Sequence, residues 1–302
     1  MTEFSPIETL NREQYNKALL HYQSALCEYC YGNIFAWSSY YQTEYAVFFD
    51  SVYVFQYHIE NKAYFSFPIG LQNDGQFKEI IQELFLWCNG KNQSVQLIFL
   101  SFLEMEKLKE FFPGQFEGEE CRDNFDYYYD TVNLKTFSGK KLHSKKNHMN
   151  KFFSLYGTSY RYEKITDQNI DQCIALNKKW CEINKKYEDI DLKIEEKIAA
   201  TFLNHFTELS LIGGLLSVNG TPCAYTVGEE AYPNADTLII HIEKALYDIQ
   251  GAYPAVFSMF LNDNPQFLSV NREDDMGDEG LRASKLSYQP KKLLEKYVCR
   301  SK

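Results

Sequence analysis

The chain has 302 residues, enough for about two domains of ordinary size. Apolar residues make up 45% of it and charged residues 24%, with no polar low-complexity tract, which excludes an intrinsically disordered chain. The formal net charge of −10 argues against a general nucleic-acid-binding surface. The sequence shows neither a secretory signal pattern nor an apolar run long enough to span a bilayer, so we expect a cytoplasmic protein without integral membrane contact.

The eight cysteines are scattered, at a density far below that of a disulfide scaffold. Cys27 and Cys30 form one C-x-x-C pair, but it lies in a segment with a helical pattern and has no second pair. We therefore expect reduced thiols, no metal and no tightly bound cofactor.

Hydrophobic periodicity predicts the elements of the first half in chain order. Apolar residues at 77, 80, 81, 84 and 85, for example, form one face of a helix. The predicted ranges are a helix at 11–30, strands at 45–57 and 63–69, a helix at 76–87, a strand at 94–100, a helix at 103–112 and a strand at 127–134.

The second half continues with a basic surface helix and then a group of strands. Asn219 and Gly220 predict a type I′ hairpin within that group. The predicted ranges are a strand at 160–165, helices at 166–184 and 192–207, strands at 209–218, 222–229 and 236–245, a helix at 251–261, a strand at 267–270, a helix at 278–285 and a last helix opened by Pro290.

Basic residues gather in the middle of the chain. No acidic residue lies between Asp130 and Glu163, whereas seven Lys and Arg residues do. A local cationic segment in an acidic protein indicates one confined site for an anionic group. On a helical wheel, Lys145 and Lys146 fall at the edges of an apolar stripe, where a lysine reaches either water or an anion in an adjacent cleft. For these two lysines and His148 we weigh anion binding and simple solvation equally.

Two segments further on carry groups that suit acyl transfer. Strict alternation would put His241 and Glu243 on one face of their strand, where either side chain could act as a general base. The alternative is that this face is solvent-exposed or internally paired. Gly251, between Gln250 and Ala252, would open a helix whose free first-turn N–H groups can hold a phosphate.

Four segments taken together, 139–152, 241–245, 251–253 and 271–285, resemble the C-terminal-domain family of phosphatidylglycerol lysyltransferases. This family is related to the Fem-type peptidoglycan aminoacyltransferases. The resemblance covers most of the chain and implies an α+β fold with two GNAT-like (acyl-CoA N-acyltransferase-like) domains in tandem. Each would be a mixed, mainly antiparallel sheet flanked by helices. We place the domains at 1–134 and 135–302, with the active site in the second.

The resemblance also implies transfer of an acyl group, often an aminoacyl group, to an amine or a hydroxyl. We expect aminoacyl-tRNA as the donor, with tRNA as a partner and a small molecule or peptide as the acceptor. His241 or Glu243 would accept a proton, and Arg282 or Lys285 would stabilise the oxyanion. The residues expected to bind the donor are Lys145, Lys146, His148, Gln250, Gly251, Ala252 and Arg272.

Two alternatives stay open. One is a coenzyme A-dependent N-acetyltransferase, in which acyl-coenzyme A is the donor. The other is a non-catalytic binding protein that retains the fold. At the position of Lys146, relatives tend to have arginine. An arginine can bind a phosphate through two N–H groups at once, whereas a lysine offers only a compact ammonium, so the identity of the anionic donor stays open. No spacing in the sequence decides the oligomeric state.

Overall fold

The structure is a computed structural model that describes residues 3–20, 22, 24–184 and 190–302. The chain divides into two compact units. Unit 1 consists of residues 1–126, 274–278 and 293–302, and unit 2 consists of residues 127–273 and 279–292. The domain boundary predicted from the sequence, between residues 134 and 135, differs from this division. The strand at 126–130 pairs within the second sheet, and the last strand of the chain pairs within the first.

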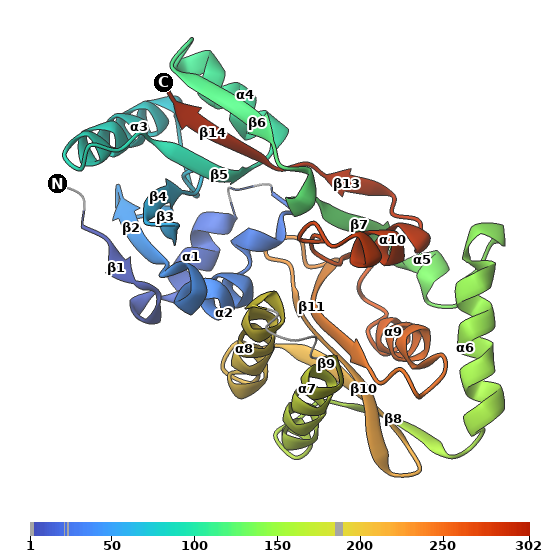
Figure 1. Cartoon of the computed structure of the whole chain (residues 1–302). Helices are drawn as coiled ribbons and strands as arrows, with labels where there is room; N and C mark the ends of the chain where they lie inside the picture. Colours follow the sequence, from blue (N-terminus) through green and yellow to red (C-terminus); the bar gives the residue numbers. More distant parts are fainter. Residues whose placement is uncertain (1–2, 21, 23, 185–189) are drawn as a thin grey trace. The chain divides into compact units, whose positions relative to one another are not determined.

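Unit 1 is built on a seven-stranded sheet in the order β1-β2-β3-β4-β5-β14-β6. The C-terminal strand β14 pairs antiparallel with both β5 and β6 (Figure 1), so strands distant in sequence lie side by side in the sheet. The strand bounds are β1 Ser5–Pro6, β2 Glu44–Phe48, β3 Val52–Ile59, β4 Lys62–Phe65, β5 Gln96–Leu100, β6 Phe116–Glu120 and β14 Tyr297–Ser301.

Helices cover both faces of this sheet. The buried face of α3 (Asp74–Asn89) and residues of α4 (Phe102–Phe111) share one core cluster with Val52 and Val54 of β3. On the other face Tyr15 of α1 (Arg12–Leu19) packs edge-on against Phe55, with α2 (Tyr31–Tyr41) beside it. Because both faces of the sheet are covered, residues 52–57 of β3 are all buried, and buried and exposed positions do not alternate along it.

Unit 2 is built on a second seven-stranded sheet in the order β13-β7-β12-β11-β10-β9-β8. Four of its ladders are antiparallel, and β11 and β12 pair in parallel. The strand bounds are β7 Asp126–Asp130, β8 Tyr160–Lys164, β9 Ile212–Val218, β10 Thr221–Glu230, β11 Thr237–Ala245, β12 Ser269–Asn271 and β13 Lys292–Leu294.

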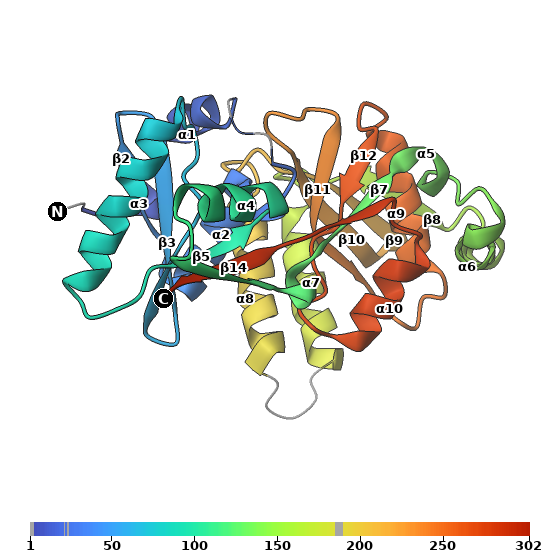
Figure 2. The same cartoon turned by 90° about the horizontal axis from the view of Figure 1, so that it is seen from above.

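Helices also lie on both faces of the second sheet. Figures 1 and 2 show α7 and α8 side by side on one face, and α9 on the other with α6 next to it. We call these the α7/α8 face and the α9 face. The helix bounds are α5 Thr131–Leu134, α6 His143–Tyr156, α7 Ile170–Asn184, α8 Ile190–Asn204, α9 Ala252–Asp263 and α10 Glu279–Ser287.

Most predicted elements are confirmed, and four are wrong in whole or in part. The strand expected at 127–134 ends at Asp130, where the short helix α5 begins. The helix expected at 11–30 ends at Leu19 and is followed by a short 3-10 turn at 27–29; positions 21 and 23 lie outside the described residues. The single strand at 45–57 is a hairpin of β2 and β3, turned by Phe49 and Asp50 at positive φ. The last helix after Pro290 is instead β13 and β14, whose hydrogen-bond partners come from distant strands. The hairpin at Asn219 and Gly220 is confirmed, with φ of 51° and 74°.

Candidate active site

The site lies where two neighbouring strands of unit 2 stop pairing. The register of β11 with β12 runs from Thr237 opposite Ser269 to Ile239 opposite Asn271. β11 then continues to Ala245, whereas β12 ends. Glu243 lies on this extension of β11, and Arg272 directly follows β12. The end of the parallel ladder therefore leaves room for these two side chains to meet.

Glu243 and Arg272 form a buried ion pair on the α9 face. Arg272 Nη2 donates to Glu243 Oε1 at 3.1 Å, and the two side chains are only 9% and 8% exposed. The guanidinium carbon lies 4.4 Å from the ring centre of Tyr288 and 4.6 Å from that of Phe257. Aromatic surroundings exclude water, so each charge depends strongly on the other.

Two atoms of this pair lack hydrogen-bond partners. Among the residues that the structure describes, Glu243 Oε2 and Arg272 Nη1 are buried and make no hydrogen bond. Buried polar atoms in native proteins are nearly always paired, so an acceptor and a donor are available here for a ligand. Burial raises the pKa of Glu243, although the Arg272 charge opposes the shift.

A second cation faces the same place. Lys145 of α6 is half-buried, with Nζ 4.1 Å from the ring centre of Tyr288. Burial lowers the pKa of Lys145 and the Arg272 charge lowers it further, while Glu243 opposes them. Lys146, its neighbour in sequence, is exposed. Of the two lysines, Lys145 is thus the one directed toward Glu243 and Arg272.

His241 does not lie on the same face as Glu243, so that prediction is wrong. Val227 pairs with Ile242 and Gly228 with Ile240, which leaves His241 as the extra residue of a β-bulge. A bulge interrupts the alternation of side chains. The His241 ring therefore lies on the α7/α8 face, stacked 4.4 Å from Phe202 of α8.

Both nitrogens of the His241 ring are paired with carboxylates. Nδ1 lies 2.7 Å from Glu273 Oε1, and Nε2 lies 3.1 Å from Glu229 Oε1. Burial lowers the pKa of His241, but the charges of Glu273 and Glu229 outweigh burial and raise it to about 9. An imidazole that is already protonated at neutral pH has no free lone pair, so the geometry argues against His241 as the general base.

The two cations expected to stabilise an oxyanion lie on α10. Lys285 is buried, and its Nζ donates to the main-chain oxygen of Arg272 at 2.6 Å. This contact holds the backbone of Arg272. Arg282 lies one turn earlier and is partly exposed. The catalytic roles assigned to both residues stay predictions.

Gly251 brings the start of α9 into contact with α6. Its φ is +81°, and an added Cβ would lie 2.2 Å from the main-chain oxygen of His148. The first turn of α9 also offers few donors, because the N–H of Ala252 already bonds to Ile249 and Pro254 has none. The space in front of Gly251 is therefore filled, which does not favour a phosphate there. The side chains of His148 and Gln250 are exposed.

We expect Gly251→Ala to lower the free energy of unfolding by about 2–4 kcal/mol, the sum of an overpacking cost and the cost of a positive φ. Urea unfolding measures it. Gly220→Ala is the matched control: its φ is +74° but an added Cβ meets nothing within 4 Å, so its cost should be only about 1 kcal/mol. Equal losses in the two variants would show that the contact with His148 is unimportant.

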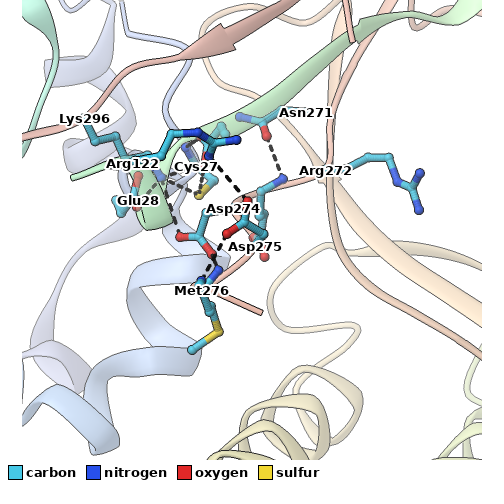
Figure 3. A network of polar contacts seen from close by, with 12 residues as sticks. Cys27, Glu28, Arg122, Asn271, Arg272, Asp274, Asp275, Met276 and Lys296 are labelled. Carbon is cyan, nitrogen blue, oxygen red and sulfur yellow. Dashed lines mark hydrogen bonds and ion pairs between the residues drawn. The ribbon is translucent and has the colours of Figure 1, made fainter. Parts of the chain in front are cut away.

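Unit 1 contains a second buried ionic cluster, shown in Figure 3. Lys296 Nζ lies 2.5 Å from Glu28 Oε1, 2.6 Å from Asp126 Oδ1 and 3.6 Å from Cys27 Sγ. The Cys27 N–H donates to Asp126 Oδ2 at 2.9 Å. The ligand atoms of Cys27, Glu28 and Asp126 lie close enough together to hold a metal ion, but the ammonium of Lys296 already lies among them. No spacing in the sequence points to this cluster, since its members are up to 269 residues apart.

A comparison with family models gives one match over residues 21–300, to "Phosphatidylglycerol lysyltransferase, C-terminal". The chain belongs to this family. Fold and family together support an acyltransferase. Among the described residues, none of the helices of this lysyltransferase-family chain combines the length and the apolar composition needed to cross a bilayer.

Individual relatives of this lysyltransferase-family chain show the same fold. A protein of unknown function from Bacteroides thetaiotaomicron is 30% identical, with all of both chains covered and a TM-score of 0.90. L-PGS from Bacillus licheniformis is 15% identical, with 96% of this chain and 91% of that one covered and a TM-score of 0.64. The expected fold class, two GNAT-like domains in tandem, is therefore confirmed.

A curated relative comes from Mycoplasmoides gallisepticum (strain R) and is described as uncharacterized protein MYCGA3080. It is 23% identical over 210 residues, which are 68% of this chain and 65% of that protein. The chain thus spans less than two thirds of the length of this relative.

Proposed function

We propose that this protein transfers an aminoacyl group from an aminoacyl-tRNA to an amine or hydroxyl acceptor, at the site formed by Glu243, Arg272 and Lys145. The observation that supports it best is that each member of this buried ion pair has one atom without a hydrogen-bond partner among the described residues, Glu243 Oε2 and Arg272 Nη1. Acyl transfer needs this combination, because one group must accept a proton while another donates to the carbonyl oxygen.

The reaction places each group in a defined role. The acceptor donates its O–H or N–H proton to Glu243 Oε2 and attacks the ester carbonyl, and the charge that develops on oxygen is stabilised by Arg272 and Lys145. The carbonyl–ribose oxygen bond then breaks, and the leaving ribose oxygen takes up the proton that Glu243 accepted, which returns Glu243 to the carboxylate. Burial favours Glu243 as the base, since its raised pKa makes it a stronger proton acceptor than an ordinary glutamate.

The exposed face of α6 supports a polyanionic carrier. It and the turn before it present several exposed lysines, and the sequence has no acidic residue between Asp130 and Glu163. Such a cationic stripe in a protein with a net charge of −10 suits phosphates of a nucleic acid. The exposed lysines are Lys140, Lys141, Lys146 and Lys151.

The packing at Gly251 weighs against coenzyme A as the carrier. A pyrophosphate would need several free N–H groups at the start of α9, but α6 covers Gly251 and Pro254 removes one donor. Acetyl-coenzyme A is therefore included in the following experiment as an alternative donor.

The test uses the full chain with a panel of radiolabelled aminoacyl-tRNAs and, separately, with acetyl-coenzyme A. Each donor is offered amines, peptides and phosphatidylglycerol vesicles as acceptors. We expect an aminoacyl-tRNA to be consumed with formation of an aminoacylated acceptor. Transfer from acetyl-coenzyme A alone would favour the N-acetyltransferase, and no transfer from any donor would favour a non-catalytic protein.

We expect the double variant Lys146→Ala/Lys151→Ala to raise the KM for the tRNA donor about 3- to 10-fold and to lessen its salt dependence, because two phosphate contacts are lost. The kcat should stay within about twofold, since neither side chain lies at the ion pair. Lys178→Ala/Lys179→Ala removes the same charge from the exposed surface of α7 and serves as the control. An identical KM in both double variants would contradict the role of α6.

A further inference from the structure

We infer that His241 is a positioning residue: as an imidazolium on the α7/α8 face it holds Glu273, and through the main chain of Glu273 it fixes Arg272 on the opposite face. The functional part of this inference rests on the proposed acyl transfer. The structural part stands by itself, because every contact that carries it lies within unit 2.

The backbone around Arg272 is constrained on both sides. The N–H of Arg272 donates to the oxygen of Tyr127 at 3.0 Å, and the N–H of Tyr127 donates to the oxygen of Glu273 at 3.1 Å. Asn271 Oδ1 accepts the N–H of Glu273 at 2.7 Å, and Lys285 Nζ bonds to the oxygen of Arg272. The end of β12 is thereby tied to β7 and α10 just where it separates from β11.

Glu273 adopts a conformation that needs support. Its φ is +56°, in the left-handed region that residues other than glycine rarely adopt. Such a conformation persists only where surrounding contacts hold it. The side chain of Glu273 supplies one such contact through the 2.7 Å bond to His241 Nδ1. The reversal at Glu273 also turns successive side chains apart, so Arg272 reaches Glu243 on the α9 face while Glu273 reaches His241 on the other.

The charged groups around His241 explain why it must be an imidazolium. Glu229 of β10 and Glu273 are bound to its two nitrogens, and α8 presents the uncharged ring of Phe202. A neutral imidazole has one N–H and can donate to only one of the two carboxylates, whereas an imidazolium donates to both. If the ring were neutral, either Glu229 or Glu273 would therefore lose its charge-assisted hydrogen bond, and no positive charge would lie between the two carboxylates.

The sign of the pH dependence follows from the raised pKa. In the unfolded chain a histidine has a pKa of about 6.5. The stability that the two ion pairs of His241 add is therefore complete below about pH 6.5 and is lost as the pH rises through about 9, the pKa of His241 in the folded protein. Positioning of Arg272 depends on the folded state alone, so it should weaken only near pH 9.

The decisive experiment needs no substrate. Amide hydrogen exchange of Tyr127 and Arg272 reports directly on the two backbone bonds, and we expect His241→Gln to speed their exchange at pH 7 by about tenfold or more, the effect of losing a charge-assisted hydrogen bond. Nitrogen-15 spectra of His241 in the unaltered chain should show both ring nitrogens protonated at pH 7, with a midpoint near pH 9. A neutral ring at pH 7, or unchanged exchange in His241→Gln, would overturn the inference.

Two further variants separate positioning from packing. Phe202→Leu removes the ring stacked on His241 but leaves both ion pairs, so exchange at Tyr127 and Arg272 should stay within about threefold of the parent. His241→Lys keeps the positive charge, so it should restore slow exchange and move the alkaline midpoint upward, toward the ordinary lysine pKa of about 10.4. Equal acceleration in Phe202→Leu and His241→Gln would indicate packing alone.

Activity then tests the functional part. If an aminoacyl donor is used, His241→Gln should lower kcat/KM about tenfold at pH 7 and remove the alkaline limb near pH 9, whereas Phe202→Leu should keep that limb. If exchange at Tyr127 and Arg272 speeds up in His241→Gln as expected but the parent chain has no transferase activity, the proposed acyl transfer is refuted and the structural role of His241 stands. Exchange effects without any change in the pH profile would refute the link to catalysis.

Discussion

Arg272→Met is expected to lower the rate of acyl transfer by about 100- to 1000-fold, the range measured when a single oxyanion donor is removed from an enzyme. Nη2 of Arg272 donates to Glu243 Oε1, and its Nη1 is buried without a hydrogen-bond partner among the described residues, so the guanidinium has a free donor beside the proposed base. Single-turnover kinetics with a charged tRNA measure the loss at the chemical step. Arg272→Lys should lower the rate less, because it keeps the positive charge. It should not restore the parental rate, since a lysine lacks the planar guanidinium that can bind two partners at once.

The same substitution should also destabilise the fold, and the two effects can be separated. Arg272→Met leaves Glu243 as a buried carboxylate without its ion-pair partner, which costs about 3–5 kcal/mol of stability. The double variant Arg272→Met/Glu243→Gln removes that charge, so stability should largely return while activity stays low. A double variant with both parental stability and parental activity would show that this pair takes no part in the reaction.

The pH profile offers an independent check on Glu243. A general base must be deprotonated, so activity should fall as the pH falls through the pKa of Glu243. Because burial raises this pKa, the acidic limb should lie above the ordinary glutamate value of about 4.3. An acidic limb at or below that value would mean that another group accepts the proton.

The fold could be predicted from the sequence where the pattern is local. The helix expected at 76–87 is α3, because its apolar residues recur every three or four positions and pack on one face of a sheet. The last strand could not be predicted in this way. β14 is inserted between β5 and β6, about 200 residues away, and nothing near Pro290 indicates that pairing.

The site could be predicted only in part, because the positions of His241 and Gly251 depend on contacts between elements that lie apart in the sequence. The sequence predicts a catalytic role for Glu243 and donor binding for Lys145 and Arg272; the structure pairs Glu243 with Arg272 and puts both cations over the ring of Tyr288, and the roles stay predictions. His241 was placed wrongly because a β-bulge is decided by the register of two strands, which alternation along one strand does not reveal. Gly251 was read as a ligand contact, whereas its missing side chain serves the packing of α9 on α6.

Lys296→Met is expected to lower the stability of unit 1 by about 3–5 kcal/mol, because it leaves buried carboxylates without their cation. Lys296 and Asp126 are fully buried, and Glu28 Oε2 has no hydrogen-bond partner among the described residues. Burial raises the pKa of Glu28 to about 8 even though the Lys296 charge opposes it. Glu28 is therefore largely protonated at pH 7 even with the lysine in place, so the loss expected from Lys296→Met arises mainly at the Asp126 carboxylate, which lies 2.6 Å from Lys296 Nζ. Urea unfolding at pH 7, followed by far-ultraviolet circular dichroism, measures the loss.

The pH dependence and a matched variant distinguish a lost charge from a lost side chain. If unpaired carboxylates cause the loss, lowering the pH protonates them, so the deficit of Lys296→Met should shrink between pH 7 and pH 5. The triple variant Lys296→Met/Asp126→Asn/Glu28→Gln should recover most of the stability at pH 7, since the Asp274 carboxylate that remains lies 4.0 Å from Lys296 Nζ and is partly exposed. Lys302→Met breaks an exposed pair with Glu117 in the same unit, with the two side chains 57% and 76% exposed, and should cost less than about 1 kcal/mol. A deficit that is the same at both pH values and persists in the triple variant would mean that Lys296 stabilises unit 1 through its packing, and that the ionic cluster contributes nothing.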